Sequence, residues 1–433
     1  MTANNFYIWT VGCQMNVADS GRAADAMREA GYARTEEVSD ANVVILNTCS
    51  VRASAERRTA GKVGALARHK QCSPDTIVVM MGCMVHPDRE LLHRQFPLVD
   101  HFIPAGDVGK LMASVPPVDD EWGTKLYDLT ADSAVTAFVP VVMGCNKFCS
   151  FCVVPYRRGR ERSIPVFEIV DEVQSLAQRG VKEVTLLGQT INHYGRDLPG
   201  KPDLADLLTA VHAVDGIERI RFLTSYPRTM TDKILQSVAD LPKVCEHINI
   251  PFQAGDNAVL RAMRRGYTIE QYYEVVERTR RIIPSVSIAT DIIVGFPGES
   301  EEQFERTYDV LEELRLDTVH TAVYSPRPGT KAYELGDPVP LEEKQRRYRV
   351  LDAQHERVSN EINAALLGTT TDVLFEGIQR GKWKGRTRTN KLVFLDSPED
   401  LAGRTVPVTI TQTGAWSMQS ELTRIRELAG TRA

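Results

Sequence analysis

The chain has 433 residues, too many for one ordinary hydrophobic core, so two or three domains are expected. Apolar residues make up 42% of it and charged residues 25%, as in a soluble globular protein, and the net charge of −5 argues against a surface that coats nucleic acid over its whole area. It contains no run of about eighteen apolar residues and does not begin with a charged-then-apolar signal, so a cytoplasmic location without membrane attachment is expected.

The first hundred residues alternate short β-rich runs, at 6–11, 43–46 and 77–81, with helical stretches at about 20–31 and 54–69. This alternation predicts an α/β domain with a parallel sheet over residues 1–115.

Each of these three β-rich runs is followed by a cysteine: Cys13, Cys49 or Cys83. Because the carboxyl ends of parallel strands lie at one edge of a sheet, the three loops can bring their thiols to one place. Each cysteine could instead be a small apolar core residue, but a position repeated three times favours an iron–sulfur cluster with one iron lacking a protein ligand. Cys72, expected on a loop, and Cys245 do not share this position and are interpreted as bystanders.

Residues 116–136 show little periodicity and contain two adjacent prolines and an acidic run, which predicts a linker. From residue 137 a second α/β series begins. Its candidate strands are 138–143, 183–187, 219–223, 247–251, 287–294 and 318–324, with helical stretches such as 166–179, 204–214, 269–283 and 301–314 between them. Six βα units predict a partly closed parallel barrel over 137–366, with its active site at the carboxyl ends of the strands.

Directly after the first barrel strand come Cys145, Cys149 and Cys152, spaced C-x3-C-x2-C on a loop. A structural zinc ion takes four protein ligands, whereas three thiolates on a four-iron cube leave one iron open to a small molecule that exchanges electrons with the cluster. The alternatives are a zinc site completed by a distant ligand such as His193, or three unrelated buried thiols. The spacing on a loop favours the cluster.

Two further features of the barrel indicate binding. Glycines and polar residues follow the later strands, at 187–192, 224–227, 251–255 and 295–299; one such glycine is best explained as a turn, but the whole set favours a ligand. Residues 155–162 contain four arginines. A charge run is usually a solvated face, but beside an open cluster Arg157, Arg158 and Arg160 are candidate contacts to phosphates of an RNA substrate. Residues 263–267 are a second, weaker case.

A polar helix at about 341–367 leads to β-rich runs at 372–375, 391–395 and 406–411, which predict a small antiparallel β-barrel over 367–433. Its segment 379–391 has no acidic residue and a tryptophan interpreted as exposed. Basic residues beside an aromatic ring are typical of proteins that bind single-stranded or loop RNA, and a merely soluble hairpin is the alternative. The candidate RNA contacts here are Lys382, Trp383, Lys384, Arg386 and Arg388.

Over nearly its whole length the chain resembles the radical S-adenosylmethionine (SAM) methylthiotransferases, and its tail is similar to their TRAM domain. The motifs that carry the resemblance are Gly12-Cys13-Gln14-Met15-Asn16, Asn47-Thr48-Cys49, Gly82-Cys83-Met84, Cys149-Ser150-Phe151-Cys152-Val153-Val154-Pro155-Tyr156, Gly159-Arg160-Glu161 and Asp291-Ile292-Ile293-Val294-Gly295-Phe296-Pro297-Gly298-Glu299. Residues 153–155, 187–189, 222–227 and 263–267 are most similar to the branch that acts on N6-isopentenyladenosine at tRNA position 37. Arg157 replaces its usual threonine, Tyr226 its usual histidine, and 248–252 is atypical.

The resemblance implies two [4Fe–4S] clusters and SAM as cofactors. The cluster at Cys145, Cys149 and Cys152 would cleave SAM to a radical that takes hydrogen from carbon 2 of adenine, and the cluster at the other three cysteines would carry the sulfur, methylated by another SAM. No side chain is implied as a catalytic acid or base. The implied SAM contacts are Phe151, Gly188, Gln189, Asn192, Gln253 and Gly295.

The implied partners are the tRNA anticodon loop, an electron donor and a sulfur donor, and a monomer is expected. Three alternatives remain: methylthiolation of the threonylcarbamoyl base in tRNA, methylthiolation of a ribosomal-protein aspartate, and a non-catalytic iron–sulfur protein that binds RNA. The basic tail argues against the protein substrate, because a polypeptide target needs no platform for stacking bases.

Overall fold

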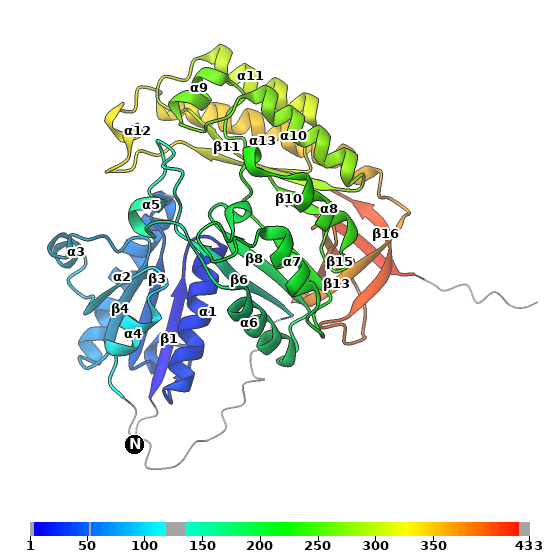
Figure 1. Cartoon of the computed structure of the whole chain (residues 1–433). Helices are drawn as coiled ribbons and strands as arrows, with labels where there is room; N and C mark the ends of the chain where they lie inside the picture. The colour runs from blue at the N-terminus through cyan, green and yellow to red at the C-terminus, as the bar shows by residue number, and fades with distance from the viewer. Residues whose placement is uncertain (1–3, 52, 118–134, 424–433) are drawn as a thin grey trace, which may run out of the picture.

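The computed structural model describes residues 4–51, 53–117 and 135–423, and begins with the predicted parallel α/β unit, blue in Figure 1. Its strands lie in the order β2-β1-β3-β4-β5 and all pair in parallel. They are β1 (Asn5–Thr10), β2 (Ala33–Arg34), β3 (Val43–Thr48), β4 (Ile77–Gly82) and β5 (His101–Pro104), and the helices are α1 (Gln14–Glu29), the 3-10 turn η1 (Val38–Asp40), α2 (Ala53–Cys72), α3 (Arg89–Gln95) and α4 (Val108–Ala113).

The uninterrupted apolar run of β3 serves both faces of this sheet, because successive side chains of a strand point in opposite directions. Val43 and Ile45 pack in a cluster with residues of α1 and α4. Val44 and Leu46 pack on the opposite face with residues of α2 and α3. The sheet is therefore covered by helices on both sides and leaves its strand ends free for a site.

Two helix boundaries differ from the sequence prediction. α1 begins at Gln14 rather than near residue 20, because its first turns bury the polar residues Asn16, Asp19 and Ser20, and buried polar positions hide the apolar period of a helix. α2 continues to Cys72, so the prediction that Cys72 lies on a loop is wrong.

The second unit is the predicted incomplete barrel, built from a sheet in the order β7-β6-β8-β9 and a sheet in the order β10-β11-β12. A bridge between Ile220 and Val244 and a hydrogen bond from Ser225 N–H to the Asn249 oxygen (2.9 Å) join the two sheets. The strands are β6 (Thr136–Met143), β7 (Arg162–Ser163), β8 (Glu183–Gly188), β9 (Arg219–Phe222), β10 (His247–Asn249), β11 (Ser287–Val294) and β12 (Thr318–Val323).

Helices cover the outside of this barrel, as the green and yellow part of Figure 1 shows. The helices of this unit, not all of them on its outside, are α5 (Val154–Arg157), α6 (Val166–Gln178), η2 (Ile191–His193), α7 (Leu204–His212), η3 (Pro227–Thr229), α8 (Asp232–Asp240), α9 (Asn257–Ala262), α10 (Ile269–Ile282), α11 (Glu301–Leu314), α12 (Lys331–Glu334) and α13 (Leu341–Ala364). One continuous apolar cluster from the strands and these helices forms the core.

The tail is a closed barrel in the order β13-β14-β15-β17-β16, orange to red in Figure 1. Its strands are β13 (Thr370–Gln379), β14 (Lys382–Thr387), β15 (Leu392–Leu395), β16 (Thr405–Thr413) and β17 (Met418–Leu422). All neighbouring pairs are antiparallel except β15 and β17, which pair in parallel, so the predicted small antiparallel barrel is confirmed with one parallel pair. The parallel pair arises because β17, which the sequence prediction missed, inserts between β15 and β16.

The predicted linker at 116–136 falls largely on residues 118–134, outside the described part of the chain. Within the described ranges, no helix has both the length and the apolar character needed to cross a membrane.

Trp383 is not an exposed stacking platform, contrary to the sequence prediction. Only 8% of it is exposed, and it lies in the core of the C-terminal barrel with Phe375 and Leu395. β14 alternates between buried residues, Trp383 among them, and outward residues such as Lys382. Pairing of β14 with β13 and β15 turns the tryptophan face inward. The exposed tryptophan of this barrel is Trp416, 55% exposed on the loop before β17.

We expect Trp383→Ala to destabilise the C-terminal barrel by about 3–5 kcal/mol, the usual cost of emptying a buried tryptophan site. Trp416→Ala is the matched control and should cost at most about 1.5 kcal/mol, the value of an exposed aromatic contact. Hydrogen exchange of the β13–β17 amides measures the free energy of opening of the C-terminal barrel in each variant. Equal protection in the two variants would contradict the buried placement of Trp383.

Candidate active site

The N-terminal cysteines sit on three loops that the sheet brings together, since β1, β3 and β4 are neighbours. The backbone N–H of Val11 donates to the carbonyl oxygen of Asn47, and that of Cys83 to the carbonyl oxygen of Thr48, both at 2.9 Å. These bonds hold the strand ends in register. Gly12 has φ +141°, and a Cβ there would lie 2.8 Å from the Cβ of Cys49. Only glycine lets the Cys13 loop approach the Cys49 loop this closely.

A buried amide pair braces the same loops from behind. Asn16 Nδ2 donates to Asn47 Oδ1 and to the Thr48 oxygen, both at 2.9 Å, and Asn47 Nδ2 donates back to the Asn16 oxygen at 2.7 Å. Asn16 Oδ1 also accepts from the Cys13 thiol at 3.5 Å. The first turn of α1, which carries Cys13 at its start, is therefore locked to the ends of the two neighbouring strands.

The second triplet lies on the loop after β6, where Cys145 and Cys149 are buried and Cys152 is half-buried. The loop is held at its centre: the Ser150 N–H donates to the Met263 oxygen (3.0 Å) and its hydroxyl to the Ala262 oxygen (2.8 Å). Burial raises the pKa of the Cys152 thiol to about 12. A cysteine binds a metal as the thiolate, which a nearby positive charge stabilises.

Neither triplet has the geometry of a single-ion site. Among the residues that the structure describes, no three His, Cys, Asp or Glu side chains lie close enough together to hold one metal ion. His193, the suggested fourth zinc ligand, has its Nδ1 3.4 Å from Glu161 Oε1. The thiolates of an iron–sulfur cube bind separate irons and need not meet at one point.

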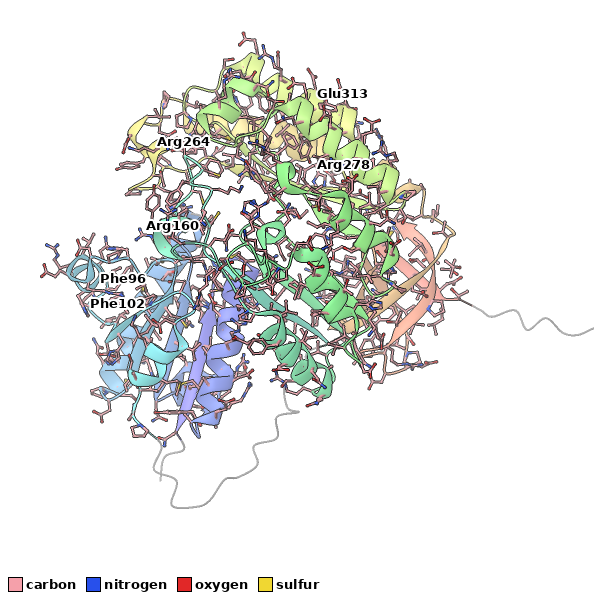
Figure 2. The ribbon with its side chains drawn as sticks, viewed as in Figure 1. Phe96, Phe102, Arg160, Arg264, Arg278 and Glu313 are labelled. Atoms are coloured by element: carbon pink, nitrogen blue, oxygen red, sulfur yellow. The ribbon has the colours of Figure 1, made fainter. Side chains whose placement is uncertain are left out.

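The three arginines predicted as RNA contacts have different surroundings. Arg158 is not available to a phosphate: its side chain is 1% exposed, paired at 2.7 Å with Asp19, and its Nε donates to Cys83 Sγ at 3.3 Å. That prediction is wrong because the folded chain, not a ligand, neutralises this guanidinium. Arg157 is half-buried, whereas Arg160 is exposed beside α5 and lies over the Phe148 ring at 4.8 Å (Figure 2).

The basic residues of the tail divide in the same way. Lys382 is exposed and Lys384 lies 3.4 Å from Glu376 of the neighbouring strand. Arg388 is instead a structural residue, because its donors bind Glu246 at 2.6 Å and the carbonyls of Pro242 and Val244.

Arg386 is held partly by the Asn390 oxygen at 3.1 Å. Arg219 and Arg221 of β9 donate to the carbonyl oxygens of Arg386, Thr387 and Arg388, so the end of β14 docks on the barrel.

The predicted SAM contacts lie at barrel strand ends, but two of them have internal roles. The Asn192 side chain donates to the Tyr226 oxygen (2.9 Å) and accepts from the Tyr226 N–H (2.8 Å), so both ends of its amide are used. The Gly295 N–H donates to Glu299 Oε2 at 2.6 Å, and a Cβ on Gly295 would lie 2.3 Å from Lys344 Cγ. The glycine at 295 therefore admits helix α13; the geometry does not require a ligand to explain it.

The remaining predicted contacts are buried or half-buried at the same strand ends. Gln253 adopts φ +75°, an unusual conformation for a residue other than glycine. Its backbone N–H donates to the backbone carbonyl oxygen of Asp291 at 3.0 Å. Gln189 and Phe151 are half-buried, and Gly188 is buried at the end of β8.

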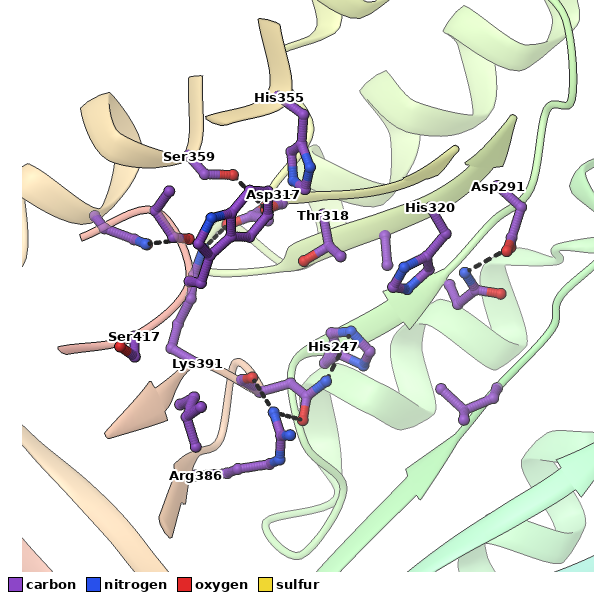
Figure 3. A pocket seen from close by; sticks show the side chains of 18 of the residues that line it. His247, Asp291, Asp317, Thr318, His320, His355, Ser359, Arg386, Lys391 and Ser417 are labelled. Atoms are coloured by element: carbon purple, nitrogen blue, oxygen red, sulfur yellow. Dashed lines mark hydrogen bonds and ion pairs between the residues drawn. The ribbon is translucent and has the colours of Figure 1, made fainter. Parts of the chain in front are cut away.

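A cavity of about 410 Å³ lies inside the barrel, closed on one side by the C-terminal barrel (Figure 3). Its volume is in the range of small-ligand sites. Gln14, adjacent to Cys13, also lines it, so the cavity extends to the loop of the N-terminal triplet. The principal polar residues of its wall are Asn249, Asp291, Asp317, His247, His320, His355, Arg386, Asn390 and Lys391.

Sequence reasoning missed this wall, although a signal existed. His247 and Asn249 are two residues apart on β10, as Thr318 and His320 are on β12, so each pair shares one face of its strand. Polar residues at such a spacing in a parallel barrel indicate a lined interior. Burial lowers the pKa of His247 to about 3, so the ring is neutral, and its Nδ1 has no hydrogen-bond partner within the described chain.

Known proteins share these features. Residues 139–311 match the Radical SAM superfamily, 5–104 the Uncharacterized protein family UPF0004, and 364–423 the TRAM domain. The tRNA-2-methylthio-N(6)-dimethylallyladenosine synthase of Roseiflexus sp. (strain RS-1) is 48% identical over 436 residues, covering 98% of this chain and 90% of its own. That of Herpetosiphon aurantiacus is 46% identical over 430 residues, covering 98% of both chains.

Among solved structures, the radical S-adenosylmethionine methyltransferase TsrM from Kitasatospora setae has a similar fold, with a TM-score of 0.56 at 15% identity over 89% of this chain and 81% of its own. Fold and site together define a radical SAM enzyme that carries a TRAM domain. Within that class the chain belongs to the tRNA-2-methylthio-N(6)-dimethylallyladenosine synthases. The family resemblance drawn from its motifs is thus confirmed.

We expect the anaerobically reconstituted protein to hold about eight irons, because each triplet can anchor one four-iron cube. Replacing Cys145, Cys149 and Cys152 by alanine should leave about four, and so should replacing Cys13, Cys49 and Cys83. The iron and zinc contents of the unchanged protein and of the two triple variants are measured, with the Cys72→Ala/Cys245→Ala variant as control. An unchanged iron content in either triple variant, or zinc in place of iron, would contradict the two-cluster arrangement.

Proposed function

We propose that this enzyme attaches a methylthio group to carbon 2 of the adenine in N6-isopentenyladenosine at position 37 of tRNA. The observation that carries the proposal is a contact between the barrel loop that follows one cysteine triplet and a cysteine of the other triplet, from a separate unit. Arg158, six residues after Cys152 in the barrel loop, contacts Cys83 of the other triplet. The names of the relatives support the same base.

In this proposal each triplet holds a [4Fe–4S] cluster, and SAM binds at the barrel cluster near Phe151, Gly188, Gln189 and Gln253. When bound, these groups supply the hydrogen-abstracting radical and the sulfur and methyl of the product, chemistry that no side chain can provide on an unactivated aromatic C–H bond. An electron donor and a sulfur donor are required. The division of the chain into 1–115, 137–366 and 367–433 is part of the proposal.

The chain's own residues would bind and orient the RNA. The cavity wall offers a neutral group, the unpartnered Nδ1 of His247, that can hydrogen-bond an uncharged base. Exposed cations outside the cavity, such as Arg160 and Lys382, would contact the phosphates of the anticodon loop. Neutral groups inside and charged groups outside match the two parts of a nucleotide.

The substrate can be tested with the reconstituted enzyme, SAM, a reductant and a sulfide source. We expect mass spectrometry of digested nucleosides to show the methylthio product from tRNA bearing isopentenyladenosine, and none from tRNA bearing threonylcarbamoyladenosine or from the ribosomal protein. The Cys13→Ala/Cys49→Ala/Cys83→Ala variant is the control and should still cleave SAM without forming product. Product from the threonylcarbamoyl tRNA alone would assign the chain to the sister reaction.

The tail can be tested separately by its salt dependence. On a single strand each true phosphate contact adds about 0.7 to the slope of log affinity against log salt. Lys382→Ser/Lys384→Ser should therefore weaken tRNA binding and lower that slope by up to about 1.4. Arg388→Lys, a change at a docked residue, should leave the slope unchanged, and an equal slope in all three proteins would exclude this face from RNA binding.

A further inference from the structure

Each cysteine triplet has one buried guanidinium in contact with one of its sulfurs. At the N-terminal triplet this is Arg158, whose Nε lies 3.3 Å from Cys83 Sγ. Its Nη2 binds Asp19 at 2.7 Å, both side chains being 1% exposed, and its Nη1 is buried without a partner in the described chain. The group comes from the barrel loop, not from the sheet that carries the cysteines.

At the barrel triplet the corresponding group is Arg265, whose Nη1 donates to Cys149 Sγ at 3.2 Å. Its Nε donates to the Tyr267 hydroxyl at 3.0 Å and its Nη2 to the Pro251 oxygen at 3.2 Å. The faces of Tyr226 and Tyr267 lie 5.5 and 5.4 Å from the guanidinium carbon. No carboxylate of the described residues forms an ion pair with it, which distinguishes Arg265 from Arg158.

A buried guanidinium without a counter-ion is costly, and the sulfurs of a thiolate-ligated cluster are the negative groups within its reach. Hydrogen bonds to such sulfurs and nearby charge are among the factors that set the reduction potential of an iron–sulfur cluster. Reduction adds negative charge, so a fixed positive donor favours the reduced form and a nearby carboxylate opposes it.

We propose that Arg158 and Arg265 are positioning residues that raise the reduction potentials of the N-terminal and barrel clusters, respectively, and that Asp19 offsets part of the effect of Arg158. This inference rests on the two-cluster arrangement of the proposed function. The three side chains bind neither iron nor substrate. The two members of the ion pair have opposite effects on the reduction potential of the N-terminal cluster: Arg158 raises it and Asp19 lowers it.

The test for Arg158 uses protein with Cys145, Cys149 and Cys152 changed to alanine, which retains the N-terminal cluster alone. Asp19→Asn leaves the guanidinium unopposed and should raise the midpoint potential in a redox titration followed by electron paramagnetic resonance. Adding Arg158→Met to Asp19→Asn should lower it again by about 59 mV or more, a tenfold change in a one-electron equilibrium. The double change avoids leaving a lone buried carboxylate.

The test for Arg265 uses protein with Cys13, Cys49 and Cys83 changed to alanine. Arg265→Met should lower the potential of the barrel cluster, and Asp19→Asn in this same protein is the control that should not move it.

Iron content separates failure of this inference from failure of the proposed function. If a parent protein with one intact triplet binds no cluster, the two-cluster arrangement itself is wrong and the inference falls with it. If the clusters form but Asp19→Asn and its double variant have equal potentials, the role of Arg158 is overturned. Should the double variant lose its iron, Asp19→Asn decides alone: a raised potential supports the inference and an unchanged one overturns it. For Arg265, an unchanged potential or a loss of the cluster in both Arg265→Met and Arg265→Lys overturns its tuning role.

Discussion

The buried ion pair between Arg158 and Asp19 is the contact on which the relation of the two cysteine triplets depends. It joins the barrel loop to α1, and removing one partner of such a pair leaves an unpaired buried charge, at a typical cost of 3–5 kcal/mol. Other pairs cross the same boundary. Arg22 and Glu172, 2.7 Å apart, are each about a third exposed and contribute less. Arg327, 7% exposed, pairs with Glu56 of α2 at 2.7 Å. The Arg158–Asp19 pair is therefore the fully buried polar contact in an interface that apolar packing and other ion pairs also hold.

α1 makes that contact possible because it packs on two units at once. Ala23 and Met27 face the N-terminal sheet, whereas Met15 and Ala18 pack against Leu187 of the barrel. A helix buried on two sides needs apolar residues around much of its circumference, and the polar residues Asn16 and Asp19 are tolerated inside only because each has bonded partners. Helix α1, which follows Cys13 directly, therefore lies between the N-terminal sheet and the barrel.

Much of this arrangement was predictable from local sequence, and the failures have one physical cause. The strand-then-cysteine repeats and the C-x3-C-x2-C loop predict which strands the cysteines follow, and the structure has the cysteines directly after β1, β3, β4 and β6. Burial of individual cationic and aromatic residues was not predictable. Arg158 and Arg160 are two residues apart in one charge run. Arg158 is nevertheless buried in an ion pair with Asp19 of α1, far away in the sequence, whereas Arg160 is exposed. The burial of Trp383 likewise follows from the pairing of β14 with β13 and β15, which its local sequence does not reveal.

The distribution of charge explains how one site can combine radical chemistry with RNA recognition. Positive groups near the sulfurs are buried and held by the fold, so they act on the clusters and not on phosphates. Within the cavity, Lys391 is paired with Asp317 at 2.9 Å and His247 is neutral, which leaves few unopposed charges where a nucleobase would lose its water. Free cations are instead at the exterior, where phosphates stay solvated. A charged interior would hold the phosphate backbone in place of the base, so the pairing of charges within the cavity favours an uncharged group there.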